Sequence, residues 1–516
     1  MKNKYKYLIG NEWRESTDVL EVRNPYNNEV VSATFFATEK DVNDAIQAAV
    51  HAFDETRKLP SYKRAEILGN IGDGIQKRSE EFARTIALEA GKPIIDARAE
   101  VERAIGTFQI AAEESKRMLG EYIPLDISER SKNRTAINKR FPIGPILGIS
   151  PFNFPLNLVV HKVAPAIASG NPIIIKPASK TPLIALLLGE VISESGWPAG
   201  GFSVFPCASS LAERMVADER IKMFTFTGSA AVGWRLKQVA GKKRVTLELG
   251  GNAGAIVDSS DNLDYAVKRC IASAFAFSGQ VCISLQRLFV NKKIYDDFVP
   301  KFLDEVKTLK MGDPLSEETR LGPMIDELSA QRIESWVNEA VKEGAVLAYG
   351  GGRRGTLYEP TILTKTTPQM KVNTNELFAP AVTVSRHDTF EEAVKRINDS
   401  AYGLQASVFT NNIRHVFYAY EHLEVGGVIV NDVPSFRADN MPYGGVKDSG
   451  VGREGVRYAM EDERREDNPL NPPLLRGTKG VVTPRSLLLC GVLNFFGRKI
   501  YAQRHTGRKW FDAGHL

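Results

Sequence analysis

A cysteine on a turn and a carboxylate at the end of an apolar run are the residues of this sequence best suited to covalent chemistry. Cys282 closes the turn-prone stretch Ser278-Gly279-Gln280-Val281, so its thiol can face a ligand. A free thiol has a pKa of about 8.5 and needs a base or a positive field to act as a nucleophile. Glu248 precedes two glycines, where a carboxylate serves either as a general base or as a simple strand-end charge. A single cysteine is more often buried and inert, so both alternatives stay open at this point.

Two glycine-containing segments are candidates for a phosphate site. Gly450-Val451-Gly452-Arg453-Glu454-Gly455 matches G-x-G-x-x-G, but the stretch before it, Tyr443–Ser449, is glycine-rich and polar, so we interpret the motif as a structural loop. The segment Phe226-Thr227-Gly228-Ser229-Ala230-Ala231-Val232-Gly233 follows a strand-like run and opens a helical pattern. Backbone N–H groups at that helix start, with the Ser229 hydroxyl, suit a phosphate, whereas an ordinary turn capped by Ser229 is the alternative.

The segments that must position these residues alternate apolar runs with helical patterns from Phe141 onward, which is typical of a parallel sheet. The first hundred residues indicate short strands followed by long amphipathic helices. In chain order we expect a hairpin at 126–140, strands at 172–175, 223–227 and 244–249, and, after a restart at Gly251, a strand at 255–257 and a helix at 263–277.

The length and the charge balance limit the class of protein. With 516 residues we expect about three domains, and 43% hydrophobic with 25% charged residues exclude a disordered or fibrous chain. The formal charge is +5, but the last 54 residues carry ten Lys/Arg against four Asp/Glu, so the first 462 residues have a net charge of −1. The part of the chain with candidate chemistry is therefore not basic, and we expect no nucleic-acid partner.

The four cysteines, at 207, 270, 282 and 490, show no C-x-x-C spacing and no adjacent histidine cluster. This pattern argues against a disulfide framework and a structural zinc site, and Cys270, within a helical pattern, is expected in the core. The N-terminus lacks the apolar core of a signal peptide, and the most apolar tail segment, Ser486–Phe496, is too short to span a bilayer. We therefore expect a cytoplasmic protein with reduced thiols and no membrane association.

Seven short motifs occur in an order and spacing that carry a resemblance: Asn153-Phe154-Pro155-Leu156, Lys176-Pro177-Ala178, Phe226-Thr227-Gly228-Ser229, Glu248-Leu249-Gly250-Gly251, Gly279-Gln280-Val281-Cys282, Glu376-Leu377-Phe378-Ala379-Pro380 and Pro442-Tyr443-Gly444-Gly445. Over about Tyr7–Asp462 the chain resembles the aldehyde dehydrogenase superfamily, and within it the lactaldehyde and semialdehyde types. The resemblance implies an α/β fold with a Rossmann-like cofactor domain, an α/β catalytic domain and a small β oligomerisation arm.

The resemblance also implies a mechanism. Cys282 would attack the aldehyde carbon, the Asn153 amide and the Cys282 N–H would form the oxyanion hole, and Glu248 would activate water to hydrolyse the thioester. No metal is required. CoA-acylating relatives typically lack the glutamate, so Glu248 favours hydrolysis over transfer to CoA.

The cofactor implied is NAD or NADP. Lys176 and Glu376 match ribose-binding positions and Ser229 the pyrophosphate site. Ser179 stands where NAD-selective members commonly carry a glutamate, so a 2′-phosphate would meet no repulsion there. The positions implied for cofactor binding are Lys176, Ser179, Gly228, Ser229, Gly233, Glu376 and Phe378.

Three residues are candidates for the substrate end of the site. His161 matches a position on the substrate tunnel, Arg437 lies in the anchor-loop region, and Arg103 is on a preceding helix. We hypothesise that some of them bind a carboxylate or hydroxyl of a short polar aldehyde, the alternative being a solvated arginine and a satisfied histidine. A different function, a catalytically impaired family-fold protein that binds nucleotide, is disfavoured by the intact Cys282, Glu248 and Asn153.

The expected domain organisation follows the resemblance. We expect an NAD(P)-binding domain at 1–119 and 143–250, an oligomerisation arm at 120–142, a catalytic domain at 251–440, a return to the cofactor domain at 441–462, and an atypical basic tail at 463–516. The family implies a homo-oligomer, but three prolines at 469, 472 and 473 stand where relatives continue into a subunit-pairing strand, which argues against the usual assembly.

Overall fold

The structure is a computed structural model that describes residues 2–118, 120–259 and 262–465. It divides into two units. The first contains the residues up to Lys116 together with Ile143–Glu463, and the second contains Arg117–Pro142 with Arg464 and Arg465. The predicted atypical tail lies outside the described residues, apart from its first three positions, and Cys490 lies outside them too. None of the described helices is long and apolar enough to cross a membrane.

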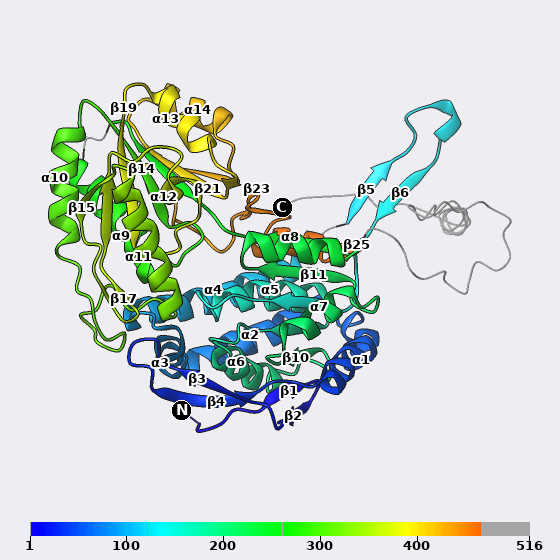
Figure 1. The fold of residues 1–516 in the computed structure, drawn as a ribbon. Coiled ribbons are helices and arrows are strands. Elements are labelled where there is room, and N and C mark those ends of the chain that lie inside the picture. Colours follow the sequence, from blue (N-terminus) through cyan, green and yellow to red (C-terminus); the bar gives the residue numbers. More distant parts are fainter. Residues whose placement is uncertain (1, 119, 260–261, 466–516) are drawn as a thin grey trace, which may run out of the picture. The chain divides into compact units, whose positions relative to one another are not determined.

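An eight-stranded sheet forms one half of the first unit (Figure 1). Its five central strands run parallel, and antiparallel strands complete both edges. In spatial order the strands are β2 (Glu12–Arg14), β1 (Tyr7–Ile9), β10 (Phe202–Val204), β9 (Ile173–Lys176), β8 (Ile146–Ile149), β11 (Met223–Thr227), β12 (Arg244–Glu248) and β24 (Gly450–Val451). The three predicted strands of this sheet are confirmed, because β-branched and aromatic runs buried on both faces specify such strands.

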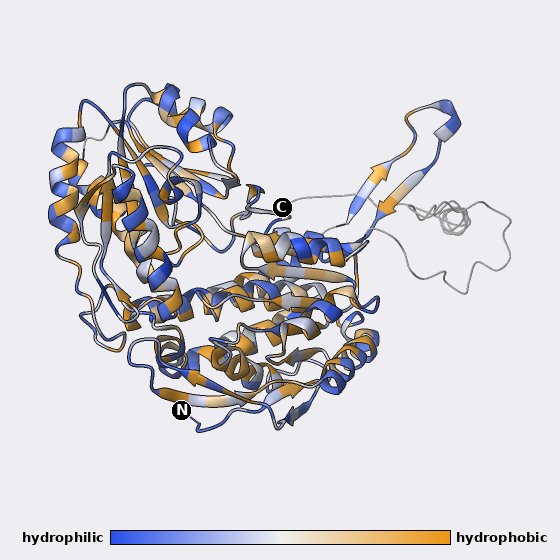
Figure 2. Cartoon of the chain, in the orientation of Figure 1, coloured by the Kyte–Doolittle hydropathy of each residue, from blue (hydrophilic) through white to orange (hydrophobic). Residues whose placement is uncertain are grey.

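Helices accompany this sheet along the chain, and α4 packs against α2, α3 and α5. Figure 2 shows that the helices carry both polar and apolar residues, as amphipathic helices do. Their bounds are α1 (Glu39–Thr56), α2 (Ser61–Lys77), α3 (Ser79–Ala90), α4 (Ile94–Lys116), α5 (Asn157–Ser169), α6 (Leu183–Ser193), α7 (Ser209–Ala217), α8 (Ala230–Val239) and α15 (Val456–Asp462). Short antiparallel strands β3 (Val19–Arg23) and β4 (Val30–Phe35) pair with each other near the start of the chain.

A seven-stranded sheet forms the other half of the first unit. Six strands are parallel and only β15 is antiparallel. The spatial order is β15 (Val346–Tyr349), β18 (Thr361–Thr364), β19 (Ala381–His387), β14 (Leu285–Asn291), β13 (Ala253–Val257), β21 (Gln405–Phe409) and β22 (Gly427–Val430). The predicted α/β class is confirmed, and the structure divides its main strands between two mainly parallel sheets.

The helices of this half pack on several apolar clusters, and Cys270 lies in one of them, as predicted. The helices are α9 (Leu263–Phe275), α10 (Tyr295–Val306), α11 (Glu327–Lys342), α12 (Lys371–Thr374), α13 (Phe390–Asn398) and α14 (Ile413–His422). The remaining short elements are the 3-10 turn η2 (Ala276–Gly279) and the strand pairs β16 (Arg353–Arg354) with β17 (Leu357–Tyr358) and β20 (Tyr402–Gly403) with β23 (Val446–Lys447).

The second unit contains the predicted hairpin. Strands β5 (Glu121–Pro124) and β6 (Thr135–Asn138) pair antiparallel around the 3-10 turn η1 (Glu129–Ser131). Its strands begin somewhat earlier than the predicted 126–140. Strand β7 (Phe141–Pro142) pairs with β25 (Arg464–Arg465).

A buried ion pair in the first unit holds the loop that leads into α5. The Lys92 ammonium lies 2.5 Å from Glu100 Oε2, and both side chains are fully buried. Glu100 Oε1 accepts hydrogen bonds from the backbone N–H groups of Leu156 and Asn157, at 2.9 and 3.1 Å, where α5 begins. The ammonium also lies 3.8 Å from the centre of the Phe154 ring. One charge pair thus ties α4 to the loop that precedes α5.

We expect Lys92→Met to lower the free energy of unfolding by about 3–5 kcal/mol, because it leaves the Glu100 carboxylate buried without its cation. Lys92→Met/Glu100→Gln should recover part of this loss, since no unpaired charge then remains at the site. Urea unfolding followed by circular dichroism measures both. The control is Lys40→Met, which removes an exposed ion pair with Asp44 and should cost less than about 1 kcal/mol. Equal losses for both lysine variants would contradict this account.

Candidate functional site

The ends of four neighbouring parallel strands bring the candidate residues together. Strands β8, β9, β11 and β12 end at or just before the segments that hold Asn153, Lys176, Ser229 and Glu248. Ligands bind outside the carboxyl ends of parallel strands, so this edge of the eight-stranded sheet is the expected position of a cofactor and a substrate.

The loop that carries Cys282 joins this edge from the other half of the unit. The Asn153 side-chain N–H donates to the Gln280 carbonyl at 2.9 Å, two residues before the thiol. Gly251, three residues after Glu248, lies so close to the Cys282 carbonyl that an added Cβ would come within 2.1 Å of its oxygen. Asn153, Glu248 and Cys282, predicted from separate motifs, therefore meet at one place.

The Cys282 loop has an unusual backbone. Phe277, Ser278 and Gly279 all have positive φ, at 44°, 54° and 67°, so α9 ends at Phe275 and not at 277 as predicted. Phe277 and Ser278 are not glycines, so their positive φ angles cost free energy, which the surrounding contacts must offset. The Ser278 hydroxyl donates to the Gly322 carbonyl at 2.7 Å, and Gln280 Oε1 accepts from the Ile325 N–H at 2.8 Å. The loop is thus held firmly in the conformation that presents the thiol.

The thiol itself has a tyrosine hydroxyl as its neighbour. Cys282 Sγ lies 3.1 Å from the Tyr443 hydroxyl oxygen, and the Arg437 guanidinium lies 3.8 Å from the centre of the Tyr443 ring. Burial raises the pKa of Cys282 to about 12, and the Tyr443 hydrogen bond opposes that rise. The raised pKa favours the neutral thiol, so Cys282 needs a base to become a thiolate.

Two buried carboxylates near the thiol have opposite titration behaviour. Among the described residues, neither oxygen of Glu248 has a hydrogen-bond partner, and burial together with the charge of Glu454 raises the Glu248 pKa well above its ordinary value. Glu454 accepts from Lys162 and Arg437, each at 3.0 Å, and these cations lower the Glu454 pKa to about 2 despite its burial. Glu248 is thus the more basic of the two carboxylates, whereas Glu454 stays ionised.

The residues predicted to bind the cofactor lie around the same edge. Ser229 is the N-cap residue of α8, its side chain makes no capping hydrogen bond, and it is exposed, so its hydroxyl and the first N–H groups of α8 suit a phosphate. Gly228 and Gly233 lie against Phe226, whose ring a Cβ at either position would meet within 3.2 Å. Their small size therefore serves packing at the strand–helix turn.

Lys176, Ser179, Glu376 and Phe378 are the other predicted cofactor positions. Lys176 ends β9, with an amine whose pKa burial lowers, and Ser179 is half-buried three residues later. Glu376 accepts from the Gly251 N–H at 2.9 Å, and burial raises its pKa to about 7. Phe378, with a φ of 47°, lines a small cavity together with Glu376 and residues flanking Cys282. These polar groups fit a nucleotide beside the Cys282 loop.

The three predicted substrate residues divide into two groups. Arg103 on α4 and the buried His161 on α5 both contact the carboxylate of Asp439, at 2.7 and 2.9 Å. Arg437 instead pairs with Glu454. The structure thus gives each of the three a carboxylate partner from within the chain.

Four residues near the thiol were not singled out from the sequence, namely Lys162, Asp439, Tyr443 and Glu454. Tyr443 stands in a quoted motif, and Glu454 lies inside the G-x-G-x-x-G segment that we interpreted as a structural loop. That interpretation is confirmed, with one refinement, since Gly450–Val451 pairs with β12 beside Glu248 as strand β24. Gly450 has a φ of 146°, and a Cβ there would lie 2.1 Å from the Leu247 carbonyl oxygen, so close strand packing requires this glycine.

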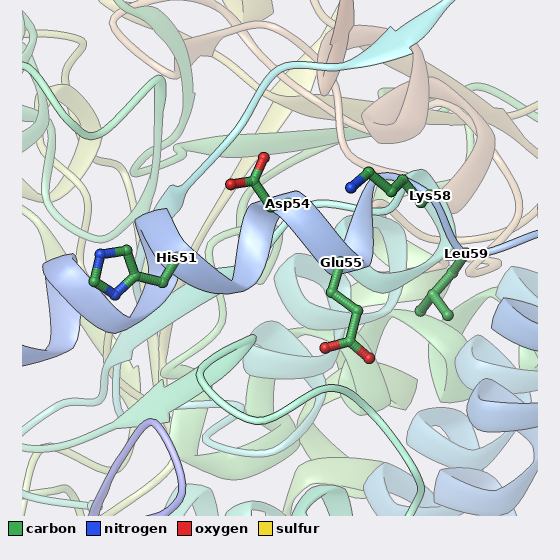
Figure 3. Close-up of a pocket in the computed structure, with 5 residues that line it drawn as sticks. All are labelled: His51, Asp54, Glu55, Lys58 and Leu59. Atoms are coloured by element: carbon green, nitrogen blue, oxygen red, sulfur yellow. The ribbon is translucent and has the colours of Figure 1, made fainter.

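A separate surface hollow has no part in this site. Figure 3 shows His51, Asp54, Glu55, Lys58 and Leu59, which line it and come from α1 and the turn after it. None of the candidate residues contributes to it. Its side chains project in different directions from one helix and form no converging set of polar groups.

Comparisons with known proteins agree with this geometry. The model of the aldehyde dehydrogenase family matches residues 13–464, so the predicted resemblance over about residues 7–462 is confirmed. The chain is 43% identical over 463 residues to 3-sulfolactaldehyde dehydrogenase from Priestia aryabhattai, which covers 90% of this chain and 97% of the relative.

Two solved structures are similar over nearly their whole length. Aldehyde dehydrogenase 21 from Physcomitrella patens, in complex with the reaction product succinate, matches with a TM-score of 0.89 and 48% identity, covering 90% of this chain and 97% of that one. Glyceraldehyde-3-phosphate dehydrogenase from Methanocaldococcus jannaschii, complexed with NADP, matches with a TM-score of 0.84 and 40% identity, covering 88% and 98%.

We expect Tyr443→Phe to raise the pKa of Cys282 further, because the thiolate loses a hydrogen-bond donor. A hydrogen bond to a charged group contributes about 1.5 kcal/mol, which corresponds to roughly tenfold slower alkylation of Cys282 by iodoacetamide at pH 8. Mass spectrometry of the Cys282 peptide measures the rate. Tyr295→Phe, on α10 beside Arg386, is the control and should leave the rate unchanged. An unchanged rate in Tyr443→Phe would show that the hydroxyl does not stabilise the thiolate.

Proposed function

The chain belongs to the aldehyde dehydrogenase family, and we propose that it oxidises a short aldehyde with a polar or charged substituent to the carboxylic acid, with NAD or NADP as the oxidant. The observation that carries this proposal is the meeting of Cys282, Asn153 and Glu248 at one buried place. A nucleophile, an amide donor and an unpartnered carboxylate are the groups that this chemistry needs.

The first step is attack by the Cys282 sulfur on the aldehyde carbon. A carbon–sulfur bond forms, and the carbonyl electron pair moves to oxygen. The second Nδ2 hydrogen of Asn153 is not used by the Gln280 carbonyl, so it can donate to this oxyanion together with the Cys282 backbone N–H. The thiol proton goes to Glu248, whose carboxylate has no competing hydrogen bond among the described residues.

The second step removes hydrogen from the same carbon. Bound NAD or NADP supplies the acceptor for the hydride, and the substrate carbon remains attached to Cys282 as a thioester. Glu248 first passes the proton that it took from Cys282 to solvent, and its carboxylate then takes a proton from water. The hydroxide attacks the thioester carbon and the carbon–sulfur bond breaks. The leaving thiolate takes the proton back from Glu248, and the carboxylic acid product is released and ionises. The raised pKa makes Glu248 a stronger base than an exposed carboxylate, which supports this role.

We assign cofactor binding to one sheet of the first unit and catalysis to the other. The eight-stranded sheet forms the cofactor domain, with Lys176 for a ribose, the α8 N-terminus with Ser229 for the pyrophosphate, and Ser179 compatible with a 2′-phosphate. Glu376, the second residue for the ribose, comes from the loop between α12 and β19 of the other half. The seven-stranded sheet forms the catalytic domain. The hairpin β5–β6 corresponds to the oligomerisation arm of the family.

The proposed substrate class draws on the relatives. One similar protein is named for 3-sulfolactaldehyde, and another was solved in complex with succinate. Both are short molecules with an anionic end. Arg103 and His161 carry the hydrogen-bond donors that such an end requires. We place the substituent of the aldehyde near these two residues.

We expect wild-type protein to form NAD(P)H with short polar aldehydes in an absorbance assay at 340 nm, and Cys282→Ala to be inactive. Glu248→Gln should keep a first-turnover burst that is slower than that of the wild type, because glutamine cannot accept the thiol proton, and should lose about 100-fold or more in steady-state rate, because the thioester is no longer hydrolysed. The matched control is Cys270→Ala, which removes a buried cysteine of α9 and should leave turnover within a few-fold. Activity that survives in Cys282→Ala would refute the mechanism, and a wild-type protein that binds nucleotide but oxidises no aldehyde would support the catalytically impaired alternative.

A further inference from the structure

The carboxylate of Asp439 occupies a site built for a carboxylate. Asp439 lies in the loop between β22 and β23 and accepts from Arg103 Nη2 at 2.7 Å, from Arg103 Nε at 3.2 Å and from His161 Nε2 at 2.9 Å. A forked arginine and a ring N–H are the donors that recognise the carboxylate of a ligand. These partners lower the pKa of Asp439, so the carboxylate is ionised across the physiological range.

This cluster of Asp439, Arg103 and His161 lies beside the reacting groups. The Arg103 guanidinium is 5.9 Å from the centre of the Phe154 ring, and Phe154 follows Asn153 directly. Two residues before Asp439 in the same loop, Arg437 stacks on Tyr443, whose hydroxyl contacts the Cys282 thiol. Neighbouring residues thus connect the cluster both to Asn153 and to the Cys282 thiol.

The charges of the cluster cancel. His161 is buried, and its pKa is lowered by burial and by the charge of Arg437, so it is a neutral donor near pH 7. Arg103 is the cation of the cluster, and Asp439 neutralises it. The neighbouring cations Lys162 and Arg437 are already paired with Glu454. These two cations share the single charge of Glu454 and keep one net positive charge. The charge of Asp439 thus decides whether Arg103 adds a second positive charge to the site that a substrate anion meets.

We propose that Asp439 is a specificity-determining residue, whose carboxylate cancels the charge of Arg103 and so limits the preference of the site for aldehydes with an anionic end over those with a hydroxyl. The inference rests on the proposed function and deepens it by assigning the charge selectivity to one side chain. An incoming carboxylate or sulfonate competes with Asp439 for the same donors, whereas a hydroxyl can donate to Asp439 and accept from Arg103.

The test compares two aldehydes of equal length, succinic semialdehyde and 4-hydroxybutanal, by the ratio of their kcat/KM values. Asp439→Asn keeps the shape and one acceptor oxygen but removes the charge, so the anionic-to-neutral ratio should rise by about tenfold. In Asp439→Asn/Arg103→Gln the gain should disappear, because it acts through the freed cation. Asp432→Asn, in the same loop but paired with Arg269, is the matched control and should leave the ratio unchanged. An unchanged or lower ratio in Asp439→Asn overturns the proposal.

A second measurement does not depend on turnover. Succinate should protect Cys282 from alkylation by iodoacetamide, and the succinate concentration that halves the rate should be about tenfold lower in Asp439→Asn than in wild type. Equal protection in both overturns the charge-selectivity proposal even where both proteins oxidise aldehydes. A wild-type protein that oxidises neither aldehyde, yet shows the shift in protection, refutes the proposed function and leaves the anion site standing.

Discussion

The arrangement of the site depends on one buried carboxylate, that of Glu454, between the cations of Lys162 and Arg437. Removing one partner of such a group leaves a buried charge uncompensated, at a cost of about 3–5 kcal/mol. Lys162 belongs to α5 and also donates to the Thr227 hydroxyl at the end of β11. Arg437 belongs to the loop that contacts the thiol through Tyr443. The interaction therefore connects the eight-stranded sheet, the glycine-containing segment 450–455 and the loop between β22 and β23.

The same pairing affects the pKa of Glu248. Two carboxylates that share a buried region cannot both be ionised at little cost, and the cations next to Glu454 determine which of them holds the charge. Glu454 takes the low pKa, and its charge adds to burial in raising the pKa of Glu248. A carboxylate without hydrogen-bond partners among the described residues is costly in a folded protein. Stability therefore does not account for the burial of Glu248 beside the Cys282 loop, which agrees with its proposed role as a base.

The fold could be predicted from local sequence to a large extent, but the contacts of the site could not. Runs such as 173–175 and 223–227 specify buried parallel strands by composition alone, and the structure has them. The end of α9 was predicted two residues too late, because the left-handed conformations of Phe277 and Ser278 are imposed by tertiary contacts and leave no signal in those residue types. The pairing of Arg103 with Asp439 spans 336 residues of chain, and that of Lys162 with Glu454 spans 292. No period or motif encodes contacts of this kind.

The G-x-G-x-x-G segment illustrates how a motif can be genuine in sequence and still serve another purpose. Its first glycine allows β24 to lie against β12 at the level of Glu248, and its glutamate is the buried Glu454. Close backbone approach is the common physical requirement of this segment and of a nucleotide loop, and glycine satisfies both. The two differ in the group for which the close approach makes room. In a nucleotide loop this group is a ligand phosphate, and in this segment it is a charged side chain of the same protein. In this chain the segment places the Glu454 carboxylate between Lys162 and Arg437. Through Arg437 it orients the loop that contains Asp439, the residue that we propose determines substrate specificity.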